Sequence, residues 1–298
     1  MKKELNFRFY ENRKYFYILS AVLLAASLIS LLTMGLNQGI DFQSGTLMDL
    51  KFDDESVSME QLRRVLAEFG LENSSITRDM EGTYVIKSLE IDEDTQTRVM
   101  EAFLSELGGF DMKRVESVGP IVGKELTQNA IVALSIASVL MLAYISVRFQ
   151  WKFAVAAICC LLHDTLIMLG FFSIFRFEVE SSFIAAVLTI IGYSINNTIV
   201  VFDRIRENMK LHPKWTGIEL VDRSVNQTLI RSINLAMTVT LVLASLIFLG
   251  GKTTRVFAIA LMAGNVAGFY SSAFISGNLW LDFKPKYVTL APRTPRKR

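Results

Sequence analysis

The sequence predicts a polytopic α-helical membrane protein with six transmembrane helices and one extracytoplasmic α+β domain of ferredoxin-like order between the first two helices. Three observations lead to this fold class. Of the 298 residues, 51% are hydrophobic, and they are concentrated in long apolar stretches. An acidic segment separates the first two stretches, and lysine and arginine are distributed unevenly between the two sides that the stretches define.

Six apolar stretches are long enough to cross the ~30 Å hydrocarbon core of a bilayer, which takes about 20 helical residues. They cover residues 16–36, 127–147, 153–175, 183–203, 232–250 and 256–280. The first is longer than the roughly 7–15 apolar residues of a signal peptide, and no small-x-small cleavage site follows it. We therefore expect it to be retained as a helix.

The basic residues predict the orientation, because cytoplasmic loops carry an excess of lysine and arginine. The N-terminal segment 1–15, the predicted amphipathic connection 204–231 and the basic tail 281–298 all fall on one side of six spans. The short loops on the opposite side contain only Arg176, Lys252 and Arg255. Both termini are therefore expected to be cytoplasmic.

The long connection, residues 37–126, is expected to fold outside the cytoplasm. It carries nineteen acidic and nine basic residues, a net charge of −10. Its hydrophobic patterns and turn residues predict six elements in a split β-α-β order, which is ferredoxin-like. The elements are a strand at 46–52, a helix at 59–69, strands at 75–79 and 83–89, a helix at 92–107 and a strand at 111–117.

Several function classes find no support in the sequence. A formal net charge of +2 gives no case for nucleic-acid binding. Cys159 and Cys160 are adjacent in an apolar run, which favours buried, inert thiols over a disulfide framework or a metal site. Gly-rich phosphate loops, HExxH, GxSxG and zinc-ligand spacings are absent, so we expect no enzyme activity, no cofactor and no metal.

The first polar group inside a predicted span is His163-Asp164, in the middle of the third helix. An acid at a helix centre costs about 2.5–3.5 kcal/mol on insertion scales, so it must face the bundle interior, be protonated or be paired. One interpretation is a proton or cation relay. The other is a hydrogen-bonded pair that fixes the third helix against a neighbour.

The second group lies on the fourth helix and comprises Gly192, Ser194, Asn196, Asn197 and Thr198. Small residues let helices approach closely in lipid, and the amides and hydroxyls can bond between helices. An amide does not titrate, so this group alone cannot carry a proton. An interhelical polar clasp is the favoured interpretation.

Two further groups lie on the fifth and sixth helices. Asn226, Gln227, Thr228 and Arg231 precede the fifth span, where Arg231 either snorkels to the interface or points into the bundle. Gly264 and Gly268 give the sixth helix a GxxxG spacing that suits close packing. Asn265, Ser271 and Ser272 lie beside them.

These residues also occur in sequence motifs that resemble the SecF subunits of the SecD/SecF protein-export family, part of the RND superfamily. GLNQGIDFQSGT resembles the family signature GIDFxGGT, and VESVGPIVGKEL resembles VGPxVGxEL. LLHDTLIML, GYSINNTIVVFDRIREN and SVNQTLIRSIN follow in the family's order. The signature positions are Gly39, Asp41, Phe42, Gly45, Gly119, Pro120 and Gly123.

The resemblance implies a half-unit that pairs with SecD in a twelve-helix bundle of the bacterial cytoplasmic (inner) membrane. It also implies association with the SecYEG translocon, with YajC and with a translocating preprotein, and export assisted by the proton motive force. Two rival functions remain open. One is a non-energised subunit that assembles or stabilises the Sec machinery, and the other is an RND-type transporter of small molecules.

Two departures from the family pattern bear on these expectations. Ser44 stands where the signature has glycine, which matters if that turn requires a positive φ. Asn197 stands where the family has an aspartate that, together with the arginine matched by Arg231, is linked to proton transport. The proton-relay candidates are therefore Asp164, His163, Arg231 and the position of Asn197.

Overall fold

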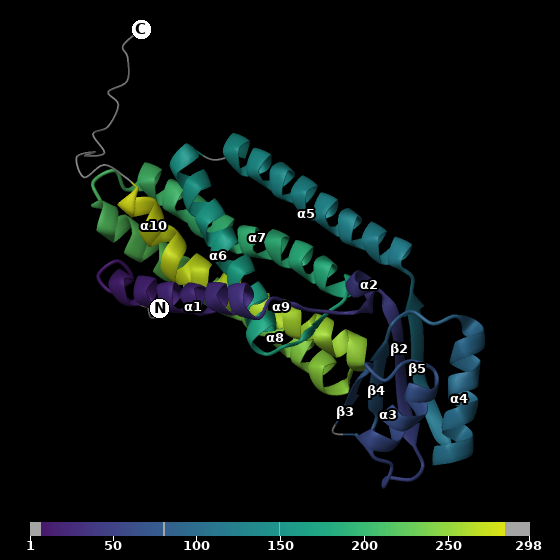
Figure 1. The fold of residues 1–298 in the computed structure, drawn as a ribbon. Coiled ribbons are helices and arrows are strands. Elements are labelled where there is room, and N and C mark those ends of the chain that lie inside the picture. The colour runs from purple at the N-terminus through teal and green to yellow at the C-terminus, as the bar shows by residue number, and fades with distance from the viewer. Residues whose placement is uncertain (1–6, 80, 149, 284–298) are drawn as a thin grey trace. The chain divides into compact units, whose positions relative to one another are not determined.

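The computed structural model describes residues 7–79, 81–148 and 150–283. The chain divides into two compact units, and Figure 1 shows the helices and strands of both. One unit is Gln38–Val132, here called the α/β unit. The remaining described residues form the helical unit.

Six helices are long and apolar enough to cross a membrane among the described residues. They are α1 (Arg13–Thr33), α5 (Pro120–Arg148), α6 (Trp151–Ile174), α7 (Ser181–Leu211), α8 (Gly217–Leu249) and α9 (Lys252–Tyr270) with its continuation. That continuation is the π-helical turn η1 (Ser271–Ile275) followed by α10 (Ser276–Asp282).

The interior of the helical unit is formed by α6, α7 and α9. Half of the most apolar window of α6 and of α7 is buried, against 6% in α5 and 11% in α8. The outer helices therefore present most of their apolar surface to lipid or to another protein. In α1, the buried positions are three serines, Ser20, Ser27 and Ser30.

The region predicted as a separate connection, 204–231, consists instead of the end of α7 and the start of α8. Only residues 212–216 lie between the two helices. Thr216 and Glu219 form a capping box that starts α8, and the His212 ring stacks on Trp215, with centroids 3.9 Å apart. Both helices thus continue past the predicted ends of the spans, which keeps their backbone groups hydrogen-bonded.

The sixth span and the second also differ from their expected limits. The sixth is interrupted by the π turn, a feature that is rare and frequently found at functional sites. The second begins early, at Pro120, because proline is well suited to the first helical position. The basic tail is described only as far as residue 283.

The α/β unit contains α2 (Ile40–Gln43), β2 (Gly45–Phe52), α3 (Met59–Glu68), β3 (Ser75–Arg78), β4 (Tyr84–Ser88), α4 (Glu93–Leu107) and β5 (Phe110–Val118). From β2 onward, the order of strands and helices is the expected one. The sheet is antiparallel in the order β3-β4-β2-β5. Two further strands of two residues each, β1 (Asn37–Gln38) and β6 (Glu178–Val179), lie in connecting segments.

The core of the α/β unit follows from the alternation along β2. Met48, Leu50 and Phe52 point to one side and pack with residues of α3 and α4, including Leu62 and Phe103. Ser58 starts α3 with a capping box, and Asp92 caps α4 by accepting a bond from the Thr95 amide at 2.9 Å. Sheet and helices thus share one apolar core.

Candidate functional site

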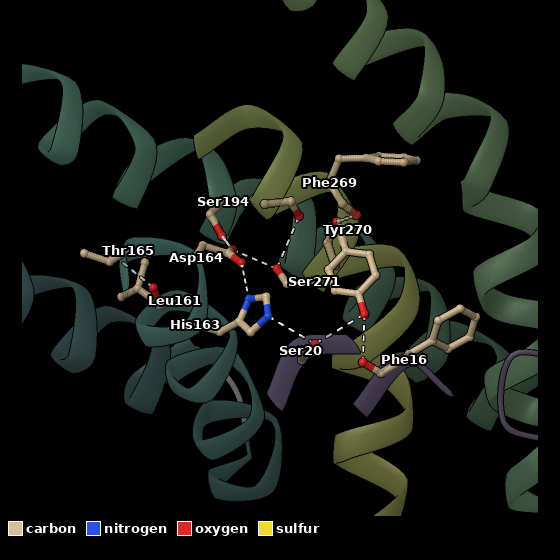
Figure 2. Close-up of polar contacts among 12 residues, drawn as sticks. Phe16, Ser20, Leu161, His163, Asp164, Thr165, Ser194, Phe269, Tyr270 and Ser271 are labelled. Carbon is tan, nitrogen blue, oxygen red and sulfur yellow. Dashed lines mark hydrogen bonds and ion pairs between the residues drawn. The ribbon is translucent and has the colours of Figure 1, made fainter. Parts of the chain in front are cut away.

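Asp164 lies in the middle of α6 and is fully buried, at 0% exposure. Its Oδ1 lies 2.8 Å from the His163 Nδ1. Its Oδ2 accepts hydrogen bonds from Ser194 of α7 and from Ser271 of η1, the latter at 2.7 Å. Figure 2 shows these side chains converging on one carboxyl group from α6, α7 and η1.

The other ring nitrogen of His163 faces α1. Its Nε2 lies 3.2 Å from the Ser20 hydroxyl, which lies 3.3 Å from the Tyr270 phenol of α9. Tyr270 in turn donates to the Phe16 carbonyl at 2.8 Å. We call the six residues Ser20, His163, Asp164, Ser194, Tyr270 and Ser271 the closed centre; Figure 2 shows its continuous path of polar contacts.

The charge of the closed centre is constrained by its burial. Among the residues that the structure describes, no lysine or arginine contacts Asp164, and His163 is its single ion-pair partner. A net charge buried without compensation is costly. Within the described chain, His163 and the hydroxyls of Ser194 and Ser271 are therefore the groups that can compensate the Asp164 carboxyl.

Close helix packing holds the closed centre together. A Cβ on Gly264 of α9 would lie 2.5 Å from Ile190 of α7, and one on Gly268 would lie 3.2 Å from the Ser194 Cβ. On the other side, a Cβ on Gly170 of α6 would overlap Ser27 of α1. Larger residues at these positions would separate the helices that carry the polar groups.

The amides on α7 point in different directions. Asn197 and Thr198 are buried, whereas the neighbouring Asn196 is exposed. None of them bonds to Asp164, whose described partners are His163, Ser194 and Ser271. Gly192 meets only Met141 of α5, at an ordinary 3.8 Å, so it does not impose the close helix approach that the sequence suggested.

The polar residues of α8 form a clasp and an exposed row. Gln227 accepts bonds from Arg204 at 2.6 Å and from Asn208 at 2.8 Å, both on α7. Arg231 is exposed and makes no described contact with the amides of α7. The exposed polar residues follow one face of the helix, and we call them the α8 row: Gln227, Arg231, Asn234 and Thr238.

The other residues singled out on α8 and α9 bond locally. Asn226 donates to the Phe7 carbonyl at 2.8 Å, and Thr228 donates to Ser224 O at 3.1 Å within its own helix. Asn265 of α9 donates to Thr240 of α8 at 3.0 Å. Ser272 donates to the Phe269 carbonyl at 3.0 Å. These contacts hold helices and terminal segments in register.

The family signature residues gather within the α/β unit. Gly39 is the N-cap of α2, whose first turn contains Asp41 and Phe42. Ser44 has φ +65°, so serine occupies the left-handed conformation at the position where the pattern has glycine. Gly45 follows with φ +137°. Because a serine at positive φ is strained, we infer that this turn is over-determined by its surroundings.

The start of α5 packs against that turn. A Cβ on Gly123 would lie 2.6 Å from the Ser44 hydroxyl, and one on Gly119 would lie 2.9 Å from the Glu90 carboxylate. Pro120 begins the helix between them. The two signatures therefore meet in space within the α/β unit.

Sequence reasoning missed several residues of the site and misjudged one. Ser20, Tyr270 and Gly170 were not singled out; the spacing of Ser20, Ser27 and Ser30 on one helical face was the available signal. Cys160 is buried as expected, but Cys159 is exposed, since the two adjacent side chains point to different sides of α6. No cluster of three or more metal-ligating side chains occurs within the described ranges.

Comparisons with known proteins identify the chain's relatives. Residues 99–286 match the family model described as protein export membrane protein SecD/SecF, C-terminal, and residues 29–55 match the SecD/SecF GG motif. The protein translocase subunit SecF of Sebaldella termitidis is 38% identical, over 92% of this chain and 91% of that protein. The protein translocase subunit SecDF of Bacillus subtilis is 40% identical over 93% of this chain.

The structure comparison agrees with the sequence matches. A crystal structure of SecDF from Thermus, titled a translocon-associated membrane protein, is 36% identical, with a TM-score of 0.83 over 93% of this chain. This chain spans 38% of that structure and 38% of the Bacillus subtilis protein. By its motifs, its six apolar helices and these matches, the chain belongs to the SecD/SecF family of protein export membrane proteins.

Proposed function

We propose that this chain is the SecF subunit of a SecDF complex and assists preprotein translocation together with SecYEG. The relatives that it matches over most of their length are named protein translocase subunits SecF. A longer relative, of which this chain covers 38%, is named protein translocase subunit SecDF. By analogy, this chain pairs with a SecD-type subunit; YajC and the emerging preprotein are further proposed partners.

The sparse burial of α5 and α8 supports a partner within the membrane. The α8 row places an arginine and an amide just before the predicted fifth span, and an amide and a hydroxyl within it, all on the surface of α8. Polar groups exposed to hydrocarbon are costly and normally face a protein partner or a water-filled cavity. The SecD-type subunit is the proposed cover of this row.

The proposed setting is the bacterial inner membrane, with both termini cytoplasmic. The α/β unit then lies outside the cytoplasm, and its sheet order and paired helices support a ferredoxin-like domain. The six candidate spans and the distribution of basic residues support this orientation.

The single observation that carries proton coupling is the buried carboxyl of Asp164, bonded to a histidine and two hydroxyls without an arginine or lysine in the described chain. Proton exchange at this pair changes the local charge inside the bundle. Each elementary charge that crosses about 100 mV releases about 2.3 kcal/mol, enough to shift a two-state arrangement of helices.

A second function is favoured by Asn197. Because an amide occupies the position where the family has an acid, a subunit that only assembles or stabilises the Sec machinery is the alternative. The two functions differ in their response to a proton gradient, so the experiment below separates them.

The test is preprotein release from vesicles that contain SecYEG, the SecD-type partner and this chain, measured with and without a proton gradient. The proposal predicts that the chain increases release mainly when the gradient is present, compared with vesicles that lack the chain. Equal stimulation under both conditions would favour the non-energised subunit. No stimulation under either condition would contradict the proposed function.

A further inference from the structure

The hydrogen bonds of the closed centre restrict where its protons can lie. A carbonyl oxygen only accepts, so the single proton of the Tyr270 phenol is used toward Phe16 O. The Ser20 hydroxyl must then donate to the Tyr270 oxygen. Because Ser20 has no second proton, its contact with His163 requires that Nε2 carries a proton and donates.

This series of hydrogen bonds requires an additional proton on the His163–Asp164 pair. If Nε2 carries the proton of a neutral ring, Nδ1 is bare, and its 2.8 Å contact with Asp164 needs a protonated carboxyl. If both ring nitrogens are protonated, Asp164 is ionised. Both forms hold one proton more than a neutral histidine beside a carboxylate, so the contacts that Figure 2 draws along this path can all be hydrogen bonds only with that extra proton.

Removal of that proton reverses the direction of one hydrogen bond in this series. The stable form is then a neutral ring that donates from Nδ1 to the Asp164 carboxylate, which leaves Nε2 as an acceptor. Ser20 must turn its proton toward Nε2 and can no longer donate to Tyr270. Among Ser20, Tyr270, His163 and Phe16, three hydrogen bonds become two, and one bond changes such an equilibrium by roughly fivefold.

The bond that is lost joins α1 to α9, and α1 is suited to respond. Its buried positions are the serines Ser20, Ser27 and Ser30, and its larger side chains are half-buried or exposed. Ser27 lies against Gly170, and the Ser30 and Ser173 hydroxyls lie 2.7 Å apart. After Thr33, the chain continues within a few residues into the α/β unit, which begins at Gln38.

We propose that Ser20 and Tyr270 are positioning residues that transmit the proton occupancy of the His163–Asp164 pair to α1, and through α1 to the domain that follows it. This inference rests on the proposed function, because it takes the pair as the site of proton exchange. The neighbouring ionisable groups are Cys160 on α6, Tyr17 on α1 and Tyr270 on α9. The packed elements α7 and η1 contribute the hydroxyls of Ser194 and Ser271.

The test follows two signals over a pH series, in the full chain bound to its SecD-type partner in lipid nanodiscs. The first is the ¹⁵N resonance of His163; the chain has two histidines, and His212→Gln leaves only this one. The second is the distance between spin labels at Leu32→Cys on α1 and Leu249→Cys on α8. Both leucines are more than 80% exposed, and Cys159 and Cys160 are replaced by alanine.

In the otherwise unchanged chain, the two signals are expected to change with the same midpoint. Ser20→Ala should keep the His163 titration and abolish the pH dependence of the label distance. Ser20→Thr, which restores a hydroxyl, should recover it. Tyr270→Phe should act like Ser20→Ala, whereas Tyr15→Phe, which alters a tyrosine that is 72% exposed on α1, should change neither signal.

The outcomes separate this inference from the proposed function. If the label distance keeps its pH dependence in both Ser20→Ala and Tyr270→Phe, the transmission through these residues is wrong, even though the pair titrates. If His163 keeps one form throughout the pH series, the pair exchanges no proton, and both the relay and the transmission are overturned.

Discussion

The closed centre and the α8 row are both polar groups in membrane helices, but they are satisfied in different ways. In the closed centre, the Asp164 carboxyl accepts bonds from Ser194 and Ser271, contacts the His163 ring and has no exposure. In the α8 row, Arg231 and Asn234 are exposed and have no hydrogen bond or ion pair within the described chain. The polar contacts of the first group lie within one chain, whereas Arg231 and Asn234 of the second are the groups left for the proposed partner.

The bonds of the closed centre do not depend on the amide at position 197. Asn197 is buried near the closed centre but takes no part in its bonds to Asp164. The chain therefore keeps a buried acid–histidine pair without the acid that the family pattern has on α7. Proton binding is consequently expected at α6.

The largest effect on stability is expected from Asn197→Asp in the chain without its partner. The new carboxylate would be buried without a described basic group nearby, at a cost of about 2.5–3.5 kcal/mol. The unfolding free energy in detergent measures this cost, and Asn197→Ser is the uncharged control. An equal loss for both variants would mean that the charge is not responsible.

The same substitution has a second expected outcome in the complex. With the SecD-type partner present, Asn197→Asp should leave export intact or increase its dependence on the proton gradient, because the family pattern has an acid there. A complete loss of assembly would argue against a relay position at residue 197.

A smaller loss is expected from Gly170→Ala, which breaks the closed centre from the α1 side. The added methyl group overlaps Ser27 of α1, and overpacking of this kind costs about 1–3 kcal/mol. Gly192→Ala is the matched control, because its methyl group meets only Met141 at 3.8 Å. Thermal unfolding of the two variants should differ; equal melting temperatures would show that α1 adjusts freely.

The smallest effect on stability is expected from Arg231→Met in the α8 row. The guanidinium has no described partner in this chain, so the unfolding free energy of the chain alone should change by no more than about 0.5 kcal/mol. Binding to the SecD-type partner, measured by co-purification, should weaken. Arg255→Met, another exposed arginine, is the control. Unchanged partner binding would separate the α8 row from the interface.

The sequence was sufficient to predict six apolar helices and the order of elements from β2 to β5, because length and hydrophobic period determine both. It also identified Asp164, since an acid among apolar residues is conspicuous. It did not identify Tyr270 or Ser20, because a tyrosine and a serine are common in membrane helices. Their role depends on how α1 and α9 pack against α6, which one sequence does not specify.

The π turn was unpredictable for a similar reason. Ser271–Ile275 contains no proline, and the sequence of the sixth span predicts one continuous helix. Ser271 nevertheless reaches Asp164 from this turn. The limits of α7 and α8 were missed because apolar content ends before the helices do.

The most direct test of the account is the gradient dependence of preprotein release with Asp164→Asn. The amide keeps the size of the side chain and most of its hydrogen bonds but cannot exchange a proton. We expect release without a gradient to be retained, and the additional release driven by the gradient to be lost together with its sensitivity to an ionophore. Gradient-driven release and ionophore sensitivity equal to those of the unmodified chain would contradict the assignment of Asp164 as the proton-carrying group.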